Sequence, residues 1–211
     1  MILITGGAGY IGSHLAYDLI NRKQDVIIVD GLLSANKDNI YAINKLLKVK
    51  IKFIKCNLLD SKRLENIFKK NKISTIFHLA GFKSINESIK NPLKYYQNNI
   101  NCTLNILSLA KKYKINKIIY SSSATVYGSN AKVPYSENSE CFADSSPYAM
   151  SKLISEKLLY DFHEANKFCK IAILRYFNPI GTHNSGKIGY DYTRSTNLIP
   201  NIIKILLNKN K

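Results

Sequence analysis

Two hydrophobic patterns alternate along the chain, and together they predict the order of its secondary structure. Short apolar runs of three to six residues, rich in isoleucine and valine, are typical of buried strands in a parallel sheet. Segments with apolar residues three and four positions apart predict the helices between them. The predicted strands are residues 2–4, 26–29, 51–54, 75–79, 117–121 and 171–176, and the clearest helices are 11–20, 92–113 and 147–166.

This alternation predicts an α/β fold, a Rossmann-type doubly wound parallel sheet with helices on both faces. The first three strands and the helices between them complete one β-α-β-α-β half by about residue 55. Ser61 is expected to cap the helix after the third strand. We expect residues 1–180 to form one domain and residues 181–211 to begin a second region.

Three glycines follow the first strand at the spacing G-x-x-G-x-x-G. Gly6 allows a tight turn, Gly9 lets the backbone approach a pyrophosphate, and Gly12 lets the next helix lie close to the sheet. Free N–H groups at the start of that helix favour an anion. Asp30 ends the second strand, 18 residues beyond Gly12, where a carboxylate accepts hydrogen bonds from adenosine ribose and repels a 2′-phosphate. The pattern predicts NAD as the cofactor, rather than NADP.

Further cofactor contacts are expected after later strands, because ligands of open α/β sheets bind at the carboxyl ends of the strands. Ala80 and Gly81 follow the fourth strand and are placed to line the cofactor, and Lys83 is placed to meet a phosphate or a ribose. Tyr176, Phe177 and Asn178 hold the corresponding positions at the carboxyl end of the last strand. We expect these three residues to contact the nicotinamide and the substrate.

Three polar residues have two interpretations each. Asn57 follows the third strand, where it either reaches an adenine or makes a simple turn. Asn98 lies in the helix 92–113 and either hydrogen-bonds a nearby loop or the cofactor, or belongs to a polar helix face. We interpret His78, inside the fourth strand, as a buried, hydrogen-bonded histidine rather than a catalytic one.

A tyrosine and a lysine stand four residues apart at the start of the helix 147–166, and therefore project from one face. These residues are Tyr148 and Lys152. A nearby ammonium and an oxidised nicotinamide, both cationic, favour the phenolate of Tyr148 and make it a base. Ser123, just after the fifth predicted strand, is placed to relay a proton from a substrate hydroxyl. The set predicts catalysis by Ser123, Tyr148 and Lys152.

The charge of the chain does not indicate nucleic acid. The formal net charge of the 211 residues is +17, but only four of the 31 basic residues are arginines, and the lysines are spread along the whole chain. A nucleic-acid interface is expected to cluster arginine with aromatic residues on one element. We therefore expect no nucleic-acid partner.

The cysteines and the N-terminus bear on the compartment. Cysteines 56, 102, 141 and 169 form no C-x-x-C pair, so we expect reduced thiols with neither a disulfide nor a metal. The N-terminal apolar run is too short for a signal peptide, and no run approaches the length of a membrane span. We expect a cytoplasmic protein without a membrane partner.

Four blocks of the sequence resemble the motifs of one family. Residues 5–14 read TGGAGYIGSH, residues 121–128 read SSSATVYG, residues 146–152 read SPYAMSK, and residues 174–181 read LRYFNPIG. In this order and spacing they are similar to the UDP-glucose 4-epimerase family of the extended short-chain dehydrogenase/reductase superfamily. The resemblance covers essentially the whole chain and implies an NAD-dependent isomerase that interconverts UDP-glucose and UDP-galactose.

The resemblance also implies the site. It implies that Ser123, Tyr148 and Lys152 are catalytic. The expected NAD contacts are Gly6, Gly9, Tyr10, Ile11, Gly12, Asp30, Asn57, Leu58, Ala80, Gly81, Lys83, Asn98, Tyr148, Lys152 and Tyr176. The expected contacts with the UDP-sugar are Ser123, Asn178, Asn197 and Leu198. It further implies a homodimer formed by the helices 92–113 and 147–166, with packing against their own sheet as the alternative.

Some positions separate this chain from its relatives. Similar 4,6-dehydratases carry an acidic pair where this chain has Ala124 and Thr125, which disfavours dehydration. Asn57 replaces the family's usual aspartate, although its carbonyl still accepts an adenine amino hydrogen. Family members run on further, so we expect the substrate domain to be largely absent, with an incomplete sugar-nucleotide region at 181–211. The alternatives are a non-catalytic remnant that keeps NAD binding and an epimerase of another UDP-sugar.

Overall fold

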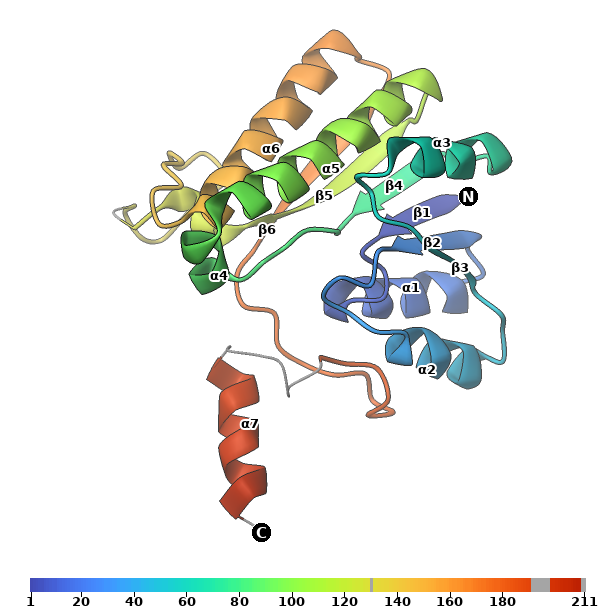
Figure 1. Ribbon diagram of the computed structural model, residues 1–211, viewed down its shortest axis with the longest axis horizontal. Coiled ribbons are helices and arrows are strands. Elements are labelled where there is room, and N and C mark those ends of the chain that lie inside the picture. Colours follow the sequence, from blue (N-terminus) through green and yellow to red (C-terminus); the bar gives the residue numbers. More distant parts are fainter. Residues whose placement is uncertain (130, 191–197, 210–211) are drawn as a thin grey trace.

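A computed structural model describes residues 1–129, 131–190 and 198–209, and its centre is one parallel sheet of six strands (Figure 1). The strands lie in the order β3-β2-β1-β4-β5-β6, which is the Rossmann order predicted from the alternation of strands and helices. Their bounds are β1 (Ile2–Thr5), β2 (Val26–Asp30), β3 (Lys52–Lys55), β4 (Thr75–His78), β5 (Lys117–Ser123) and β6 (Lys170–Tyr176).

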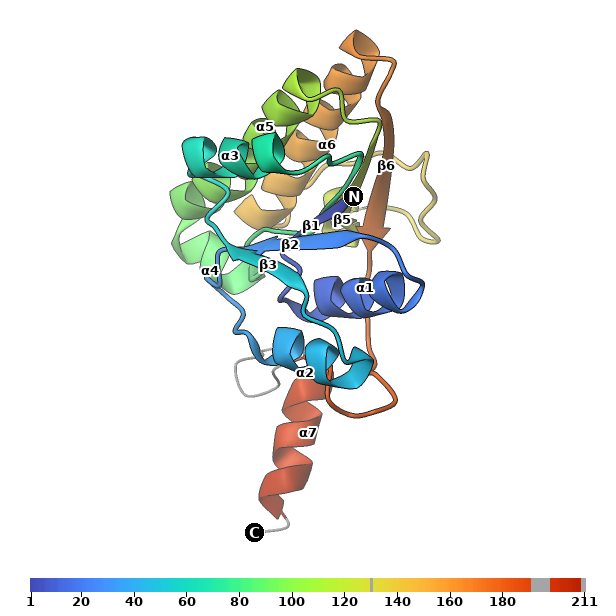
Figure 2. The ribbon, with the colours of Figure 1, turned by 90° about the vertical axis from the view of Figure 1, so that its right-hand side faces the viewer.

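Helices cover both faces of the sheet (Figures 1 and 2). The helices α1 (Tyr10–Asn21) and α2 (Asp38–Leu47) cover one face. The opposite face carries α3 (Ser61–Lys70), α5 (Pro92–Lys112) and α6 (Pro147–Ala165), while the short helix α4 (Ile85–Lys90) lies beside the start of α6. The crossover helices are therefore divided between the faces as a doubly wound sheet requires.

Alternate side chains of the strands fill two hydrophobic cores. On β1, Leu3 packs beneath α3 and α5 with the larger cluster, whereas Ile4 packs with α1 and α2 on the other face. This follows from the two-residue repeat of a strand. Ile28 of β2 joins the second cluster, and so does Ile188, which is fully buried although it lies far along the chain. Residues 181–190 thus pack onto the Rossmann core, while the domain division at residue 180 stays a prediction.

The face of the sheet beside β6 is less well covered. Ile171 and Ile173 pack against the larger core, but Leu174, which points to the other face, is 40% exposed. The last helix, α7 (Leu198–Lys209), extends away from the sheet (Figures 1 and 2). Its apolar side chains are largely exposed: Leu198, Ile202, Ile205 and Leu206. The described residues therefore leave apolar surface both on β6 and on α7.

Three local features differ from the sequence expectation. Asp60, not Ser61, caps α3, because its carboxylate accepts a hydrogen bond from the Arg63 N–H at 2.9 Å. The strand β5 continues to Ser123 and leads into a short 3-10 helix, Ala124–Tyr127. The helix α4 was not predicted. None of the helices in the described part of the chain is long and apolar enough to cross a membrane.

Candidate active site

The glycine loop between β1 and α1 is too tightly packed for side chains. Gly6 has φ +71°, and a Cβ there would lie 2.7 Å from the Ala80 nitrogen. A Cβ on Gly12 would lie 2.7 Å from the Gly7 Cα. Gly12 therefore lets α1 approach the backbone of the loop, whereas we had expected it to let the helix approach the sheet. The glycine that faces the sheet is Gly7, where a Cβ would meet Ile28 at 2.6 Å. Crowding therefore excludes a side chain at Gly6, Gly7 and Gly12, whereas a Cβ on Gly9 would meet only the Gly6 oxygen, at 3.3 Å.

The start of α1 and Asp30 together suit a negatively charged dinucleotide. Gly9, in extended conformation, is the N-cap of α1, and the first turn carries no acidic residue that would neutralise the positive end of the helix dipole. The buried Asp30 carboxylate accepts hydrogen bonds from the Ala8 N–H at 3.1 Å and the Leu32 N–H at 2.8 Å. Burial raises the pKa of Asp30, and both backbone hydrogen bonds oppose this rise. Asp30 thus anchors the loop and keeps further lone pairs for ribose hydroxyls.

Beyond β3, Asn57 makes a turn. Its side-chain oxygen accepts a hydrogen bond from the Leu59 N–H at 3.0 Å, and the residue is exposed. The turn interpretation is thus correct, and contact with an adenine stays a prediction. Leu58 is buried in the larger core, so its side chain serves packing, and its carbonyl accepts a hydrogen bond from Asn105 at 2.8 Å. Contact of Leu58 with NAD stays a prediction.

A buried asparagine that we did not predict fixes the loop after β4. Asn99 accepts a hydrogen bond from the Phe82 N–H at 2.9 Å and donates to the Phe82 carbonyl at 3.1 Å and to Ser151 Oγ at 3.0 Å. Asn98, which is also buried, donates to the Asn99 side-chain oxygen at 3.1 Å. A Cβ on Gly81 would lie 3.7 Å from the Lys152 ammonium nitrogen. Asn99 therefore ties the loop of Ala80 and Gly81 to the helix α6 that carries Lys152.

The predicted contacts Tyr10 and Lys83 both meet the segment after β6. The Tyr10 hydroxyl donates to the Gly181 carbonyl at 2.7 Å, and the Lys83 ammonium lies 4.2 Å from the centre of the Tyr190 ring. Ile11, in the first turn of α1, is partly buried. Contacts of these residues with NAD stay predictions, but the structure places Tyr10 and Lys83 on two sides of the same segment.

The three residues predicted to be catalytic converge at the carboxyl ends of β5 and β6. Ser123 ends β5, and Tyr148 and Lys152 project from the first turns of α6. Tyr148 is 8% exposed and Lys152 is 5% exposed. Thr125 donates to Ser123 Oγ from its N–H at 3.3 Å and from its hydroxyl at 3.0 Å. Because these bonds use Ser123 as an acceptor, its own proton is left for another acceptor, and Ser123 is close enough to Tyr148 to lower the pKa of that tyrosine.

Burial and hydrogen bonding act in opposite directions on Tyr148. Burial raises the pKa of Tyr148, and the hydrogen bond with Ser123 lowers it by less. The Lys152 nitrogen lies 6.0 Å from the centre of the Tyr148 ring and donates to the Ser121 carbonyl at 2.7 Å. In the protein alone Tyr148 is therefore a neutral phenol. The phenolate predicted from the sequence requires positive charge beyond that of Lys152 at this distance.

Lys152 lies between a neutral histidine and a carboxylate. Burial lowers the pKa of Lys152 to about 8, and the negative charge of Glu156, one turn further along α6, opposes this. Burial, with the positive charge of Lys152, lowers the pKa of His78 to about 3. The ring of His78 hydrogen-bonds the hydroxyls of Thr5 at 2.8 Å and Thr103 at 3.3 Å. His78 is thus the buried, satisfied residue expected from its place in the strand.

Glu156, which the sequence analysis missed, is held by two strands. Its carboxylate accepts hydrogen bonds from Ser122 on β5 and from Arg175 on β6, with Arg175 Nη2 at 2.9 Å. Arg175 also donates to the Glu137 carbonyl at 3.2 Å. This pair fixes the carboxylate beside Lys152 and joins α6 to the end of the sheet.

The expected sugar contacts are less well defined than the cofactor loop. Tyr176 ends β6 directly opposite Ser123 in the strand register, and burial raises its pKa. Asn178 follows it and is exposed at the same edge of the sheet. Leu198 begins α7 and is exposed, and Asn197 lies outside the described residues. The structure brings Tyr176 opposite Ser123, and no side-chain hydrogen bond joins Asn178 to another of the described residues.

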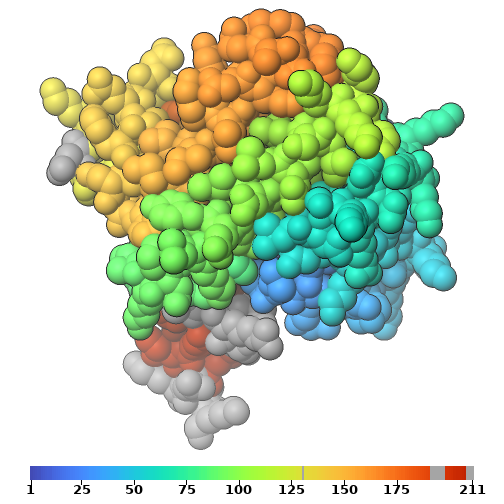
Figure 3. All heavy atoms as spheres, turned by 45° about the horizontal axis from the view of Figure 1, so that its top comes forward, coloured from blue at the N-terminus to red at the C-terminus, as the bar shows by residue number. Residues whose placement is uncertain are grey.

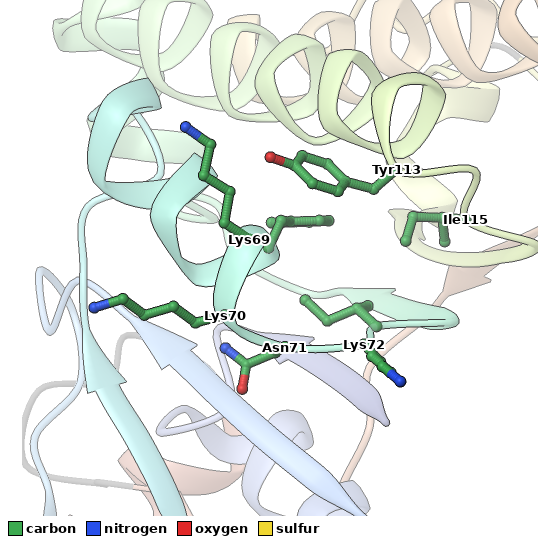
Figure 4. A pocket seen from close by; sticks show the side chains of 8 residues that line it. Lys69, Lys70, Asn71, Lys72, Tyr113 and Ile115 are labelled. Atoms are coloured by element: carbon green, nitrogen blue, oxygen red, sulfur yellow. The ribbon is translucent and has the colours of Figure 1, made fainter.

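A hollow of about 480 Å³ lies near the amino ends of β4 and β5 (Figure 4). The predicted catalytic residues lie at the carboxyl ends of the strands, so the hollow is not part of this site. It is lined by the end of α3 and the residues after α5, including Lys69, Lys70, Lys72 and Tyr113. These lysines end or follow the helix α3, where cations compensate the negative end of the dipole. Their positions are explained by the helix alone.

The fold and the glycine loop define a dinucleotide-binding Rossmann protein, in which a serine, a tyrosine and a lysine converge at the carboxyl ends of the strands. Residues 2–210 match the NAD dependent epimerase/dehydratase family, and the chain belongs to that family. The cofactor named by the family is NAD, as expected from Asp30 and the glycine loop.

Individual relatives agree with this assignment. The chain is 43% identical over 209 residues to UDP-glucose 4-epimerase of Erwinia amylovora, covering 99% of this chain and 62% of that protein. It is similar to the structure of UDP-glucose-4-epimerase from Stenotrophomonas maltophila with bound NAD and formylated UDP-arabinopyranose, with a TM-score of 0.93 and 34% identity over 98% of this chain and 62% of that one. It is also similar to UDP-N-acetylglucosamine 4-epimerase from Methanobrevibacter ruminantium M1 in complex with UDP-N-acetylmuramic acid, with a TM-score of 0.85 and 35% identity over 99% of this chain and 63% of that one. The chain thus spans slightly less than two thirds of the length of these relatives.

Proposed function

We propose that this chain forms the cofactor-binding and catalytic part of a UDP-hexose 4-epimerase, which interconverts UDP-glucose and UDP-galactose through a 4-keto sugar. The observation that carries the proposal is the convergence of Ser123, Tyr148 and Lys152 at the edge of the sheet where the glycine loop opens. The names of its relatives, among them UDP-glucose 4-epimerase, support the same reaction.

The residues present fit NAD. Glycine at positions 6, 7 and 12 keeps the turn free of side chains, because a Cβ at any of them would come within 2.7 Å of other atoms. Backbone can therefore approach a diphosphate there, and Asp30 can hold the adenosine ribose. Lys152 is placed to bind the nicotinamide ribose. When bound, NAD supplies the acceptor for the hydride at C4 of the sugar and the donor that returns it.

The protein residues then handle the proton. Tyr148 accepts the proton of the sugar 4-hydroxyl through Ser123 as the C4 carbonyl forms, and the Lys152 ammonium stabilises the phenolate. The 4-keto sugar presents its other face, and Tyr148 returns the proton to the C4 oxygen when the hydride is added. Ala124 and Thr125 stand where related dehydratases carry acidic residues, which is consistent with a reaction that loses no water.

The test is to supply the chain with NAD and UDP-galactose and to measure UDP-glucose. Ser123→Ala is expected to lower the rate by about a hundredfold, whereas Ser108→Ala, an exposed serine on α5, is expected to leave it unchanged. UDP-N-acetylglucosamine, offered in parallel, tests the activity named for the relative from Methanobrevibacter ruminantium. A chain that binds NAD and converts neither sugar would be a non-catalytic remnant.

We also propose that two copies associate through α5 and α6. These helices lie side by side and form neighbouring ridges on one surface (Figure 3). Leu93, Leu104 and Tyr160 are exposed apolar residues on them. Analytical ultracentrifugation is expected to detect a dimer that Leu104→Glu dissociates, and a monomeric parent chain would contradict the proposal.

A further inference from the structure

Residues 181–190, which we call the strap, are anchored at both ends to the glycine-loop side of the fold. The Tyr10 hydroxyl donates to the Gly181 carbonyl at 2.7 Å. At the other end, the Asn39 side chain exchanges two hydrogen bonds with the backbone of Gly189, both of 3.2 Å. Between these ends Ile188 is fully buried among the side chains beneath α1 and α2. The strap is therefore a packed part of the structure.

The strap is also connected to the glycine loop itself. The Asn39 side-chain nitrogen that donates to Gly189 also donates to the Ala8 carbonyl at 3.2 Å. Ala8 in turn donates its N–H to Asp30. One asparagine thus sets the position of the strap relative to the residues expected to hold the adenosine and the diphosphate.

Tyr190 ends the strap between Tyr10 and Lys83, which lie on either side of the expected cofactor position, here called the groove. Its ring meets the ring of Tyr10 edge to face, with 5.5 Å between the centres, and the Lys83 ammonium lies 4.2 Å from its centre. Tyr10 begins the helix after β1, whereas Lys83 follows β4. These two strands are neighbours at the point where the strand order reverses, which is where dinucleotides cross an open α/β sheet.

We propose that the strap crosses over the diphosphate of bound NAD and that Tyr190 retains the cofactor. This rests on the NAD-dependent reaction proposed above. Retention suits that chemistry, because the hydride taken from C4 has to return to the same sugar. The ring links Tyr10 to Lys83 across the groove, so NAD leaves only after these contacts open. Loss of one aromatic contact and one cation–π contact corresponds to about tenfold faster release.

Release of NAD from the loaded chain tests the strap directly. Tyr190→Ala is expected to release NAD about tenfold faster, while Tyr190→Phe, which keeps the ring, stays close to the parent chain. The matched control is Phe168→Ala, which removes a similar pair, with Lys114 at 5.1 Å from the ring, far from the groove. Equal release rates for the parent chain and Tyr190→Ala would overturn the proposal. A parent chain that takes up no NAD would instead contradict the proposed function.

Trypsin provides a second measurement that needs no variant. Lys187 is an exposed residue of the strap, and Lys132, in the exposed loop after Gly128, serves as the internal control. Bound NAD is expected to slow cleavage after Lys187 severalfold and to leave cleavage after Lys132 unchanged. Cleavage at Lys187 that is insensitive to NAD would show that the strap does not lie over the cofactor, even if Tyr190→Ala failed to fold.

Discussion

At the scale of the residue, Lys152 shows how burial sets both chemistry and stability. Its pKa is lowered to about 8 by burial, with Glu156 opposing, whereas the unfolded chain keeps the ordinary value. Between the folded-state pKa of about 8 and the ordinary lysine pKa of about 10.4, the unfolded state binds more protons than the folded state. The free energy of unfolding therefore rises with pH across this window. Below about pH 8 Lys152 is charged in both states, and the full cost of burying its charge is subtracted from the free energy of unfolding.

We therefore predict that Lys152→Met stabilises the chain at pH 7 while it abolishes catalysis. The gain is expected to be about 1–3 kcal/mol, since each pKa unit corresponds to about 1.4 kcal/mol and the hydrogen bond to Ser121 is lost. Urea unfolding at pH 7 and pH 10 measures it, with the exposed Lys111→Met as control. The gain should shrink at pH 10, and a difference from the parent chain that does not depend on pH would contradict the account.

Asn99 gives a second prediction at this scale. Asn99→Ala leaves the N–H and the carbonyl of Phe82 without their partner, which is expected to cost about 1–3 kcal/mol of unfolding free energy. It is also expected to weaken NAD binding, because the loop of Ala80 and Gly81 loses its link to α6. Asn101→Ala, an exposed position on the same helix, should change neither quantity. An unchanged NAD affinity in Asn99→Ala would mean that Asn99 serves stability alone.

Most of the residues that the sequence revealed have partners close along the chain or hold a position that the strand order alone predicts. Tyr148 and Lys152 share a helix face, and the glycines belong to one loop. Asn99 and Ser151 are 52 positions apart, and Glu156 is bound to residues of two different strands. Such contacts arise only when the sheet brings distant segments together, so spacing alone could not identify them.

At the scale of the element, the ends of the six strands and of the three clearest helices were predicted to within two residues. The six apolar runs identify the six strands because the sheet is buried on both faces over most of its width. The extension of β5 to Ser123 depends on pairing with Tyr176 of β6, which no local pattern encodes. The helix α4 has only six residues, too few to show an apolar repeat.

The start of α3 tests which residue is its cap. Asp60→Ala removes the acceptor for the Arg63 N–H and is expected to lower the free energy of unfolding by about 1 kcal/mol. Ser61→Ala, at the first helical position, is expected to change it by less than about 0.5 kcal/mol. Urea unfolding of the two variants compares them, and a larger loss in Ser61→Ala would restore the cap inferred from the sequence.

At the scale of the whole molecule, the strand order followed from the alternation of elements, but the packing of the strap did not. Ile188 is buried by residues of β1, β2 and α2, and nothing in its local sequence distinguishes it from an exposed isoleucine. The same scale reveals the apolar surface of α7, where Leu206 is 58% exposed. An exposed surface of this kind favours association.

Charge on α7 is therefore expected to reduce association of the chain. Ile205→Lys combined with Leu206→Glu should shift light scattering at high protein concentration toward smaller particles. The affinity for NAD should not change, because α7 lies away from the glycine loop (Figure 1). Unchanged particle size in the variant would show that this helix does not mediate association.

The proposed reaction is tested most directly by UDP-galactose that carries deuterium at C4. The account predicts that the chain, supplied with NAD, forms UDP-glucose with the deuterium still at C4, because the hydride returns to the sugar from a retained cofactor. Tyr148→Phe should form product more slowly by a factor on the order of a hundred. Product in which hydrogen from water has replaced the deuterium would contradict hydride transfer at C4, and an NAD-loaded chain that forms no product would contradict catalysis by this site.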